Sequence, residues 1–168
     1  MITDTSIDVL AAAVGAALRN RGESLATAES CTGGLVAAAI TAIAGSSEWV
    51  DRGFVTYSNE AKRDMLSVEE ATLAMHGAVS EATVLEMAVG ALGFSQAEWA
   101  LAISGIAGPT GGSPGKPVGT VCFAWAGPDH LLDAETCRFD GDREAVRKQA
   151  VVNALRGLLQ RLEIPARA

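Results

Sequence analysis

The sequence predicts an α/β fold in three layers, α/β/α, with helices on both faces of a mixed, mainly parallel sheet of about five strands. Predicted strands and helices alternate along the first two thirds of the chain, which is the order of a parallel sheet with crossover helices. Two strand-like segments joined by Gly127-Pro128-Asp129 then follow each other directly. This spacing predicts an antiparallel hairpin that completes a mixed sheet.

Apolar residues at helical spacing, from Ile7 to Leu18, predict a first helix over residues 4–21. A short strand is expected at 24–29, followed by an alanine-rich, nearly all-apolar helix at 33–44 that we expect to be buried. A second strand is expected at 54–58, and Ser58 or Asn59 can cap a helix at 59–66. A short helix at 68–76 and a longer one at 80–92, capped by Ser80, complete this half.

The second half begins with a third strand, expected at 99–104. Residues 105–119 contain six glycines and three prolines, which predicts a loop. Its length exceeds that of ordinary connections and indicates a functional role. The hairpin strands are expected at 118–125 and 131–139, and Asp142 begins a final amphipathic helix at 142–162.

Composition narrows the class of protein. The 168 residues suffice for one core, and no repeat or linker divides them, so we expect a single domain over residues 1–168. Hydrophobic residues make up 49% and charged residues 20%, as in globular proteins. The net charge of −7 argues against nucleic-acid binding, which depends on a basic surface, but permits a small anionic ligand.

The cysteines and histidines predict neither disulfides nor metal. Three cysteines without a CxxC pair argue against a disulfide framework or a four-cysteine zinc site. His76 and His130 lie in no metal-ligand spacing, so we expect no metal site. No apolar run reaches the roughly 18 residues of a membrane helix, and the N-terminus lacks the pattern of a signal peptide. We therefore expect a reduced, cytoplasmic protein.

The strongest candidate for a site is the turn Glu29-Ser30-Cys31-Thr32-Gly33-Gly34, where a strand ends and a helix is expected to begin. Free N–H groups and the helix dipole at such a point can hold a phosphate or an oxyanion. The two glycines permit close approach of a ligand. The alternative is an ordinary helix cap formed by Ser30 or Thr32.

Lys62 is expected in the first turn of a helix, near its positive end, where a surface cation is unfavourable. A partly desolvated lysine in such a place has a lowered pKa and can act as a base. Tyr57, the only tyrosine, ends the preceding strand and can relay a proton or hold a ligand. The alternative is a solvated Lys62 and a Tyr57 that packs at the edge of the core.

Two further segments carry candidate ligand-binding residues. Ser104 and Gly105 end a strand and open into the glycine-rich loop that contains Gly108. Because ligands of α/β sheets gather at the carboxyl ends of strands, Ser30, Tyr57 and Ser104 are expected to converge on one pocket.

Arg143, on the first turn of the last helix, can bind a phosphate or carboxylate, or it can be a solvated arginine. Arg147 lies one turn later on the same helix face. Cys31 stays open as an alternative nucleophile, because a cysteine at a helix N-terminus has a lowered pKa.

Six segments occur in a characteristic order: TAESCTGG at 27–34, GFVTYSNEAK at 53–62, HGAVSE at 76–81, ISGIAGP at 103–109, KPVGTV at 116–121 and GDR at 141–143. Together they closely resemble the CinA C-terminal domain family and its stand-alone nicotinamide-nucleotide amidases. The likeness runs over roughly residues 5–162 and covers this domain alone, without the molybdopterin-binding-like domain of full CinA. Thr110 stands where many relatives have an acidic residue.

The resemblance implies hydrolysis of nicotinamide mononucleotide to nicotinate mononucleotide and ammonia, with no metal or other cofactor. It places the nucleophile on Ser30 and the family's tyrosine and lysine on Tyr57 and Lys62. It also places Ser104 and Arg143 in the site.

On this hypothesis Lys62 accepts the Ser30 proton, directly or through Tyr57. Backbone N–H groups of residues 31–33 or 104–105 hold the oxyanion. Arg143 and the loop 108–112 bind phosphate or ribose, and Glu29 orients Lys62 or faces the pyridinium ring. The partner would be a small molecule, and a homodimer is expected. The alternative function is a non-catalytic nucleotide- or protein-binding module linked to competence or DNA-damage responses.

Overall fold

The structure is a computed structural model and describes residues 4–165, so both ends of the expected domain, residues 1 and 168, lie outside it. The elements in chain order are α1 (Asp4–Arg21), β1 (Leu25–Glu29), α2 (Leu35–Thr41), the 3₁₀ helix η1 (Ser46–Glu48), β2 (Val50–Val55), α3 (Asn59–Leu66), α4 (Glu70–His76), α5 (Glu81–Gly93), β3 (Trp99–Gly105), β4 (Thr120–Gly127), β5 (Leu131–Arg138) and α6 (Arg143–Leu162).

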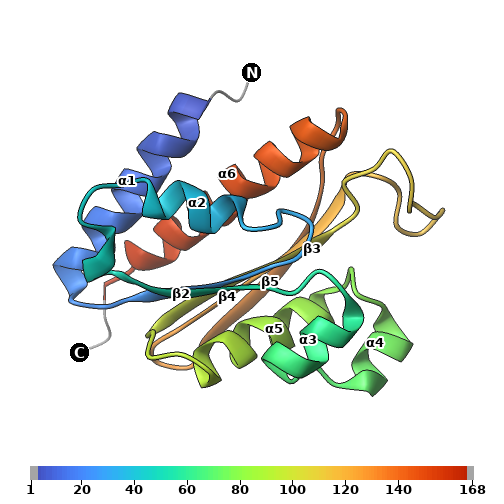
Figure 1. The fold of residues 1–168 in the computed structure, drawn as a ribbon, viewed down its shortest axis with the longest axis horizontal. Coiled ribbons are helices and arrows are strands. Elements are labelled where there is room, and N and C mark those ends of the chain that lie inside the picture. Colours follow the sequence, from blue (N-terminus) through green and yellow to red (C-terminus); the bar gives the residue numbers. More distant parts are fainter. Residues whose placement is uncertain (1–3, 166–168) are drawn as a thin grey trace.

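The strands form one five-stranded sheet in the order β2-β1-β3-β4-β5. β1 pairs in parallel with β2 and β3, whereas β4 pairs antiparallel with β3 and β5. Helices α1, α2 and α6 cover one face of this sheet, and α3, α4 and α5 cover the other (Figure 1). The predicted three-layer α/β/α fold with a mixed sheet is therefore confirmed.

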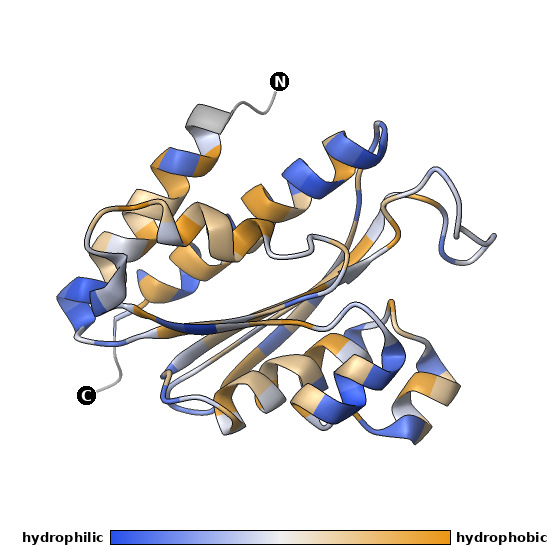
Figure 2. Ribbon diagram, viewed as in Figure 1, coloured by the Kyte–Doolittle hydropathy of each residue, from blue (hydrophilic) through white to orange (hydrophobic). Residues whose placement is uncertain are grey.

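The two faces of the sheet carry side chains of different size. Because side chains alternate along a strand, Leu101 and Ile103 of β3 pack toward α1 and α6, in a core that also holds Trp49 and Trp125. Ala100 and Ala102 point the other way, into a second core rich in alanine beneath α5. The inner strands β1, β3 and β4 are buried along almost their whole length, whereas the first turns of α6 are hydrophilic (Figure 2). The small side chains allow α5 to lie close to the sheet.

Two elements are observed at positions that differ from those predicted. The helix expected at 33–44 is α2, Leu35–Thr41, because Gly33 and Gly34 have φ of +57° and +102° and cannot continue a helix. The strand expected at 54–58 is β2, Val50–Val55. Its polar residues Asp51 and Arg52 are exposed because β2 lies at the edge of the sheet, and they mask the strand pattern.

The expected caps are found where they were predicted. Ser58 Oγ accepts a hydrogen bond from the N–H of Ala61 at the start of α3. Ser80 Oγ does the same for Thr83 in α5, and the Asp142 carboxylate for Ala145 in α6. These caps fix where α3 and α6 begin. Lys62 of α3 and Arg143 of α6 thereby lie at the same end of the sheet.

Candidate active site

The carboxyl ends of β1, β2 and β3 meet at one edge of the sheet, as expected for adjacent parallel strands. Ser30 directly follows β1, and Ser104 is the next-to-last residue of β3. Both serines are buried. A cavity of about 170 Å³ opens at this edge. It is lined by Ser30, Cys31, Tyr57, Lys62, Ala78, Val79, Ser104, Gly105, Ala107 and Arg143.

Lys62 crosses this cavity to contact the Ser30 side chain. Its Nζ lies 3.0 Å from Ser30 Oγ, 2.8 Å from the Thr56 carbonyl oxygen and 3.3 Å from the Tyr57 carbonyl oxygen. The two carbonyls can only accept hydrogen bonds, so in the neutral amine they take both N–H groups. The lone pair is then left for the hydroxyl of Ser30.

Burial favours the neutral form of this lysine. Only 1% of Lys62 is exposed, and desolvation lowers the pKa of its amino group below the ordinary value, although the nearby Cys31 opposes part of that shift. The lowered pKa increases the fraction of Lys62 that is neutral at a given pH, and only the neutral amine can act as a general base.

Tyr57 and Arg143 lie at the rim of the cavity. The Tyr57 side chain is 64% exposed, and its hydroxyl accepts a hydrogen bond of 3.2 Å from Arg143 Nη2. Arg143 also donates through Nη1 to the carbonyl oxygen of Gly108 at 2.9 Å. The structure does not place the Tyr57 hydroxyl as a proton relay, because Lys62 contacts Ser30 directly. Gly108 contacts the site only through the hydrogen bond that its carbonyl oxygen accepts from Arg143, and it does not line the cavity.

Cys31 differs from its expected state. Its thiol is buried, and desolvation raises its pKa to about 11, despite the opposing effect of the Arg147 charge. The helix that was expected to lower the pKa begins four residues later, at Leu35. A Cβ at Gly105 would lie 3.1 Å from Cys31 Sγ, so the thiol packs against the end of β3. The thiolate needed for a cysteine nucleophile is thus disfavoured.

Four of the predicted turn residues, Glu29, Thr32, Gly33 and Gly34, do not line the cavity. The Glu29 carboxylate is fully buried and accepts hydrogen bonds from Thr32 Oγ1 at 2.7 Å and from the N–H groups of Val36 and Ala37 at 2.9 and 3.1 Å. It therefore holds the start of α2 and neither orients Lys62 nor faces the cavity. Neither Ser30 nor Thr32 caps α2, because its N-cap is Gly34.

Arg147, Ala78 and Val79 were not predicted as site residues, although Ala78 and Val79 lie in the characteristic segment HGAVSE. Arg147 donates from Nε to the Cys31 carbonyl oxygen at 3.0 Å and from Nη2 to that of Thr32 at 3.3 Å, which fixes the turn after Ser30. Its spacing of four from Arg143 was the only indication. Ala78 and Val79 form an apolar wall of the cavity from the loop before α5.

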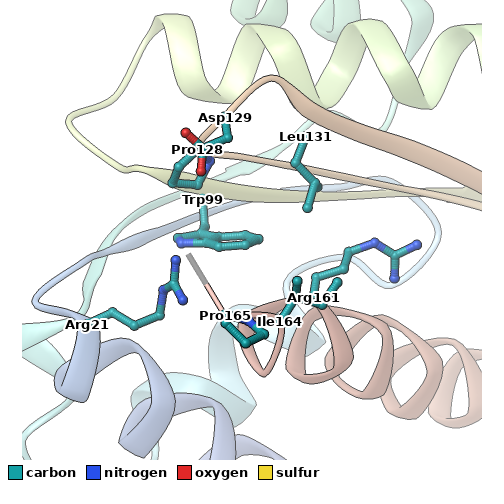
Figure 3. A pocket seen from close by; sticks show the side chains of 8 residues that line it. All are labelled: Arg21, Trp99, Pro128, Asp129, Leu131, Arg161, Ile164 and Pro165. Atoms are coloured by element: carbon teal, nitrogen blue, oxygen red, sulfur yellow. The ribbon is translucent and has the colours of Figure 1, made fainter. Parts of the chain in front are cut away.

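A second cavity, of about 270 Å³, lies at the opposite end of the strands. Trp99, at the start of β3, stands at its centre, with Arg21 and Arg161 beside it (Figure 3). Arg21 Nε is held by Glu23 and Arg161 Nε by Asp133. Its lining contains no serine, cysteine or lysine, whereas the first cavity brings Ser30 and Lys62 together.

Comparison with known proteins identifies the family of this chain. Residues 7–162 match the CinA C-terminal domain. The chain belongs to the CinA C-terminal domain family. Two relatives within this family are named nicotinamide-nucleotide amidohydrolase PncC. The one from Escherichia coli is 58% identical and covers 95% of this chain and 96% of its own, and the one from Pseudomonas putida is 52% identical and covers 92% and 96%.

A solved structure of the family extends the likeness to three dimensions. The competence damage-inducible protein A (ComA) of Klebsiella pneumoniae superposes with a TM-score of 0.91 at 47% identity, over 95% of this chain and 99% of the other. Within residues 4–165, no group of three histidine, cysteine or acidic side chains could hold a metal ion. No helix in this part of the chain is both long and apolar enough to cross a membrane.

Proposed function

We propose that this chain hydrolyses the carboxamide of nicotinamide mononucleotide, giving nicotinate mononucleotide and ammonia. Relatives of this name match nearly the whole chain at 52% and 58% identity. The observation that carries the proposal is the 3.0 Å contact between buried Lys62 Nζ and Ser30 Oγ. It favours an enzyme over a non-catalytic binding module, because buried titratable groups with a shifted pKa cluster at functional sites.

In the first step neutral Lys62 acts as general base for Ser30. The hydroxyl proton moves to Nζ as Oγ forms a bond to the carboxamide carbon, whose C=O electrons move to oxygen. The Thr56 and Tyr57 carbonyls hold the resulting ammonium through its other two N–H groups. Direct contact makes a relay through Tyr57 unnecessary.

The oxyanion formed in this step needs donors close to Ser30. The N–H of Gly33 already donates to the Ser30 carbonyl oxygen at 3.0 Å, and that of Ser30 to Ile103 at 3.0 Å. We assign the oxyanion to the backbone N–H of Cys31, which lines the cavity, together with the hydroxyl of Ser104. Arg147 keeps the Cys31 peptide in place through its carbonyl oxygen.

Collapse of the tetrahedral intermediate breaks the bond between carbon and nitrogen. Lys62 returns its proton to the departing nitrogen, which leaves as ammonia, and Ser30 remains as an ester of the pyridine carboxylate. Water then attacks the ester carbon with Lys62 again as base. The bond to Oγ breaks and Oγ regains a proton, so the enzyme is restored and nicotinate mononucleotide is released.

The experiment is an ammonia-release assay on nicotinamide mononucleotide, with the nucleotide product identified by chromatography. The wild-type chain is expected to be active, whereas Ser30→Ala and Lys62→Met each lower kcat by about a thousandfold or more. Circular dichroism checks that both variants fold. Cys31→Ala is the matched control and retains most of the turnover, because its thiol stays protonated.

Two outcomes would overturn this assignment. Near-normal turnover in Ser30→Ala would remove Ser30 as the nucleophile. Loss of turnover in Cys31→Ala alone would assign the role to the thiol.

We further propose that the protein is a cytoplasmic homodimer. Its three cysteines are free, which suits a reducing compartment such as the cytoplasm.

The homodimer is supported by an exposed apolar surface, where Val89, Phe94 and Leu132 can contact a second copy of the chain. Sedimentation velocity would show a monomer if this is wrong.

A further inference from the structure

We propose that the positive charge of the nicotinamide ring drives the proton off Lys62, so that binding of the substrate itself turns the lysine into the base; this rests on the proposed function. In nicotinamide mononucleotide the ring nitrogen is bonded to the ribose and carries a fixed positive charge. Ser30 has to reach the carboxamide carbon of this ring, and Lys62 Nζ lies only 3.0 Å from Ser30 Oγ. A charged lysine and the charged ring would therefore share one cavity of about 170 Å³.

The hydrogen bonds around Lys62 also suit the charged amine as long as no substrate is bound. An ammonium group has three N–H donors. Three oxygens surround Nζ, those of the Ser30 hydroxyl and of the Thr56 and Tyr57 carbonyls, at 3.0, 2.8 and 3.3 Å. Desolvation lowers the pKa of Lys62, but hydrogen bonds to these oxygens favour the charged form. The substrate thus meets a lysine whose proton still has to be removed.

No acidic side chain in the cavity offsets the charge of the ring. Of the side chains that the structure describes, those lining the cavity include two cations, Lys62 and Arg143, but no aspartate or glutamate. The Cys31 thiol is neutral near neutral pH, because burial raises its pKa to about 11. The buried Glu29 carboxylate does not line the cavity and accepts its hydrogen bonds from Thr32 and the start of α2.

Charged side chains on the neighbouring helices lie outside the cavity as well. Arg147 of α6 is held by the carbonyl oxygens of Cys31 and Thr32. Glu86 of α5 lines a separate groove. Exposed positions hold Glu60, Arg63 and Asp64 of α3, Glu70 and His76 of α4, and Glu81 of α5. The ring therefore acts on Lys62 without a carboxylate between the two charges.

The effect of the ring on Lys62 is strong because little water screens it. Only 1% of Lys62 is exposed. A positive charge about 6 Å away in such surroundings favours the neutral amine over the charged one by roughly tenfold or more. As the ring enters, the proton on Nζ passes to the solvent. The hydrogen bond to Ser30 then reverses, since Oγ accepts from the ammonium but donates to the neutral amine.

The test compares nicotinamide mononucleotide with an analogue in which a carbon atom replaces the charged ring nitrogen. The pKa seen in kcat/KM belongs to the free protein, and the pKa seen in kcat belongs to the complex. For the nucleotide, we expect the pKa in kcat to lie below that in kcat/KM, and KM to fall about tenfold as Lys62 loses its proton. The inhibition constant of the neutral analogue, which carries the same phosphate, is expected to change much less.

Calorimetry counts the released proton without turnover. Binding of the nucleotide and of the neutral analogue to Ser30→Ala is measured in buffers of different ionisation enthalpy over a range of pH. The nucleotide is expected to release more protons than the analogue. The double variant Ser30→Ala, Lys62→Met is the matched control, in which both ligands release equal numbers. Equal release by both ligands in Ser30→Ala would assign the effect to desolvation and overturn the role of the ring charge.

The outcomes separate the two proposals. If the wild-type chain hydrolyses the nucleotide but the pKa in kcat equals or exceeds that in kcat/KM, the inference is wrong and the proposed function stands. If the wild-type chain does not hydrolyse the nucleotide, the proposed function fails, and the calorimetric comparison then tests the inference alone. Greater proton release by the nucleotide supports it, and equal release or no binding of the nucleotide overturns it.

Discussion

Lys62 is the residue whose ionisation decides when the proposed reaction can begin. Burial lowers its pKa, and only the neutral amine can accept the Ser30 proton. We therefore expect kcat/KM to rise as the pH increases through the lowered pKa of Lys62 and then to level off. The measurement is a pH–rate profile of the wild-type chain. Activity that falls over the same range would show that the charged form is required.

The lysine also shows how far sequence reasoning reaches at this scale. The unfavourable position of Lys62 in the first turn of a helix indicated a role, and the Ser58 cap that sets this position was predictable. The contact with Ser30 was not, because it joins residues 32 positions apart through the pairing of β1 with β2. For Cys31, the predicted lowering of the pKa was wrong, since it relied on a helix start that two glycines displace.

At the scale of elements, Glu29 lies in the predicted site motif but stabilises the start of helix α2. Its carboxylate accepts three hydrogen bonds at the start of α2. Glu29→Ala leaves these buried donors without a partner and is expected to lower the free energy of unfolding by about 3 kcal/mol. Urea denaturation measures this. Glu29→Gln, which keeps one acceptor oxygen, should lose less; equal losses would contradict the role of the oxygens.

The glycine-rich loop after β3 is tied to the far side of the cavity. Lys116 Nζ donates a 2.6 Å hydrogen bond to the His76 carbonyl oxygen at the end of α4. The same loop carries Gly108, which holds Arg143. Lys116→Met is expected to raise KM severalfold with a smaller change in kcat, because the substrate contacts loosen but Ser30 and Lys62 do not move. Steady-state kinetics measure both, and restoration of KM in Lys116→Arg is the control.

Secondary structure was predictable where a cap and an apolar pattern agree, as in α3, α5 and α6. It was less so where tertiary contacts decide. β2 is held as a strand by its pairing with β1, in spite of its polar edge. α2 is short because Gly33 and Gly34 shape the turn after Ser30. The catalytic cavity could be predicted only in part, since residues from distant parts of the chain line it, among them Ser30, Ala78 and Arg143.

On the scale of the whole molecule, α5 and α3 pack closely against each other within the helical layer that covers one face of the sheet (Figure 1). A Cβ at Gly90 would fall on the backbone of Leu66 in α3. Gly90→Ala is therefore expected to lower the free energy of unfolding by about 2 kcal/mol, despite the higher helix propensity of alanine. Gly93→Ala is the matched control in α5, because nothing lies within 4 Å of its Cβ position. Equal stability of the two variants would contradict close packing here.

The groups proposed for catalysis come from all three layers: Ser30 follows the interior strand β1, Lys62 lies on α3, and Arg143 begins α6 on the opposite face. No single segment contains a working fragment of the site. Turnover thus reports on the mutual alignment of the layers. A small shift of either helical layer would abolish turnover before circular dichroism detected any loss of helix. On warming, the loss of activity is therefore expected to precede or coincide with thermal unfolding and never to follow it.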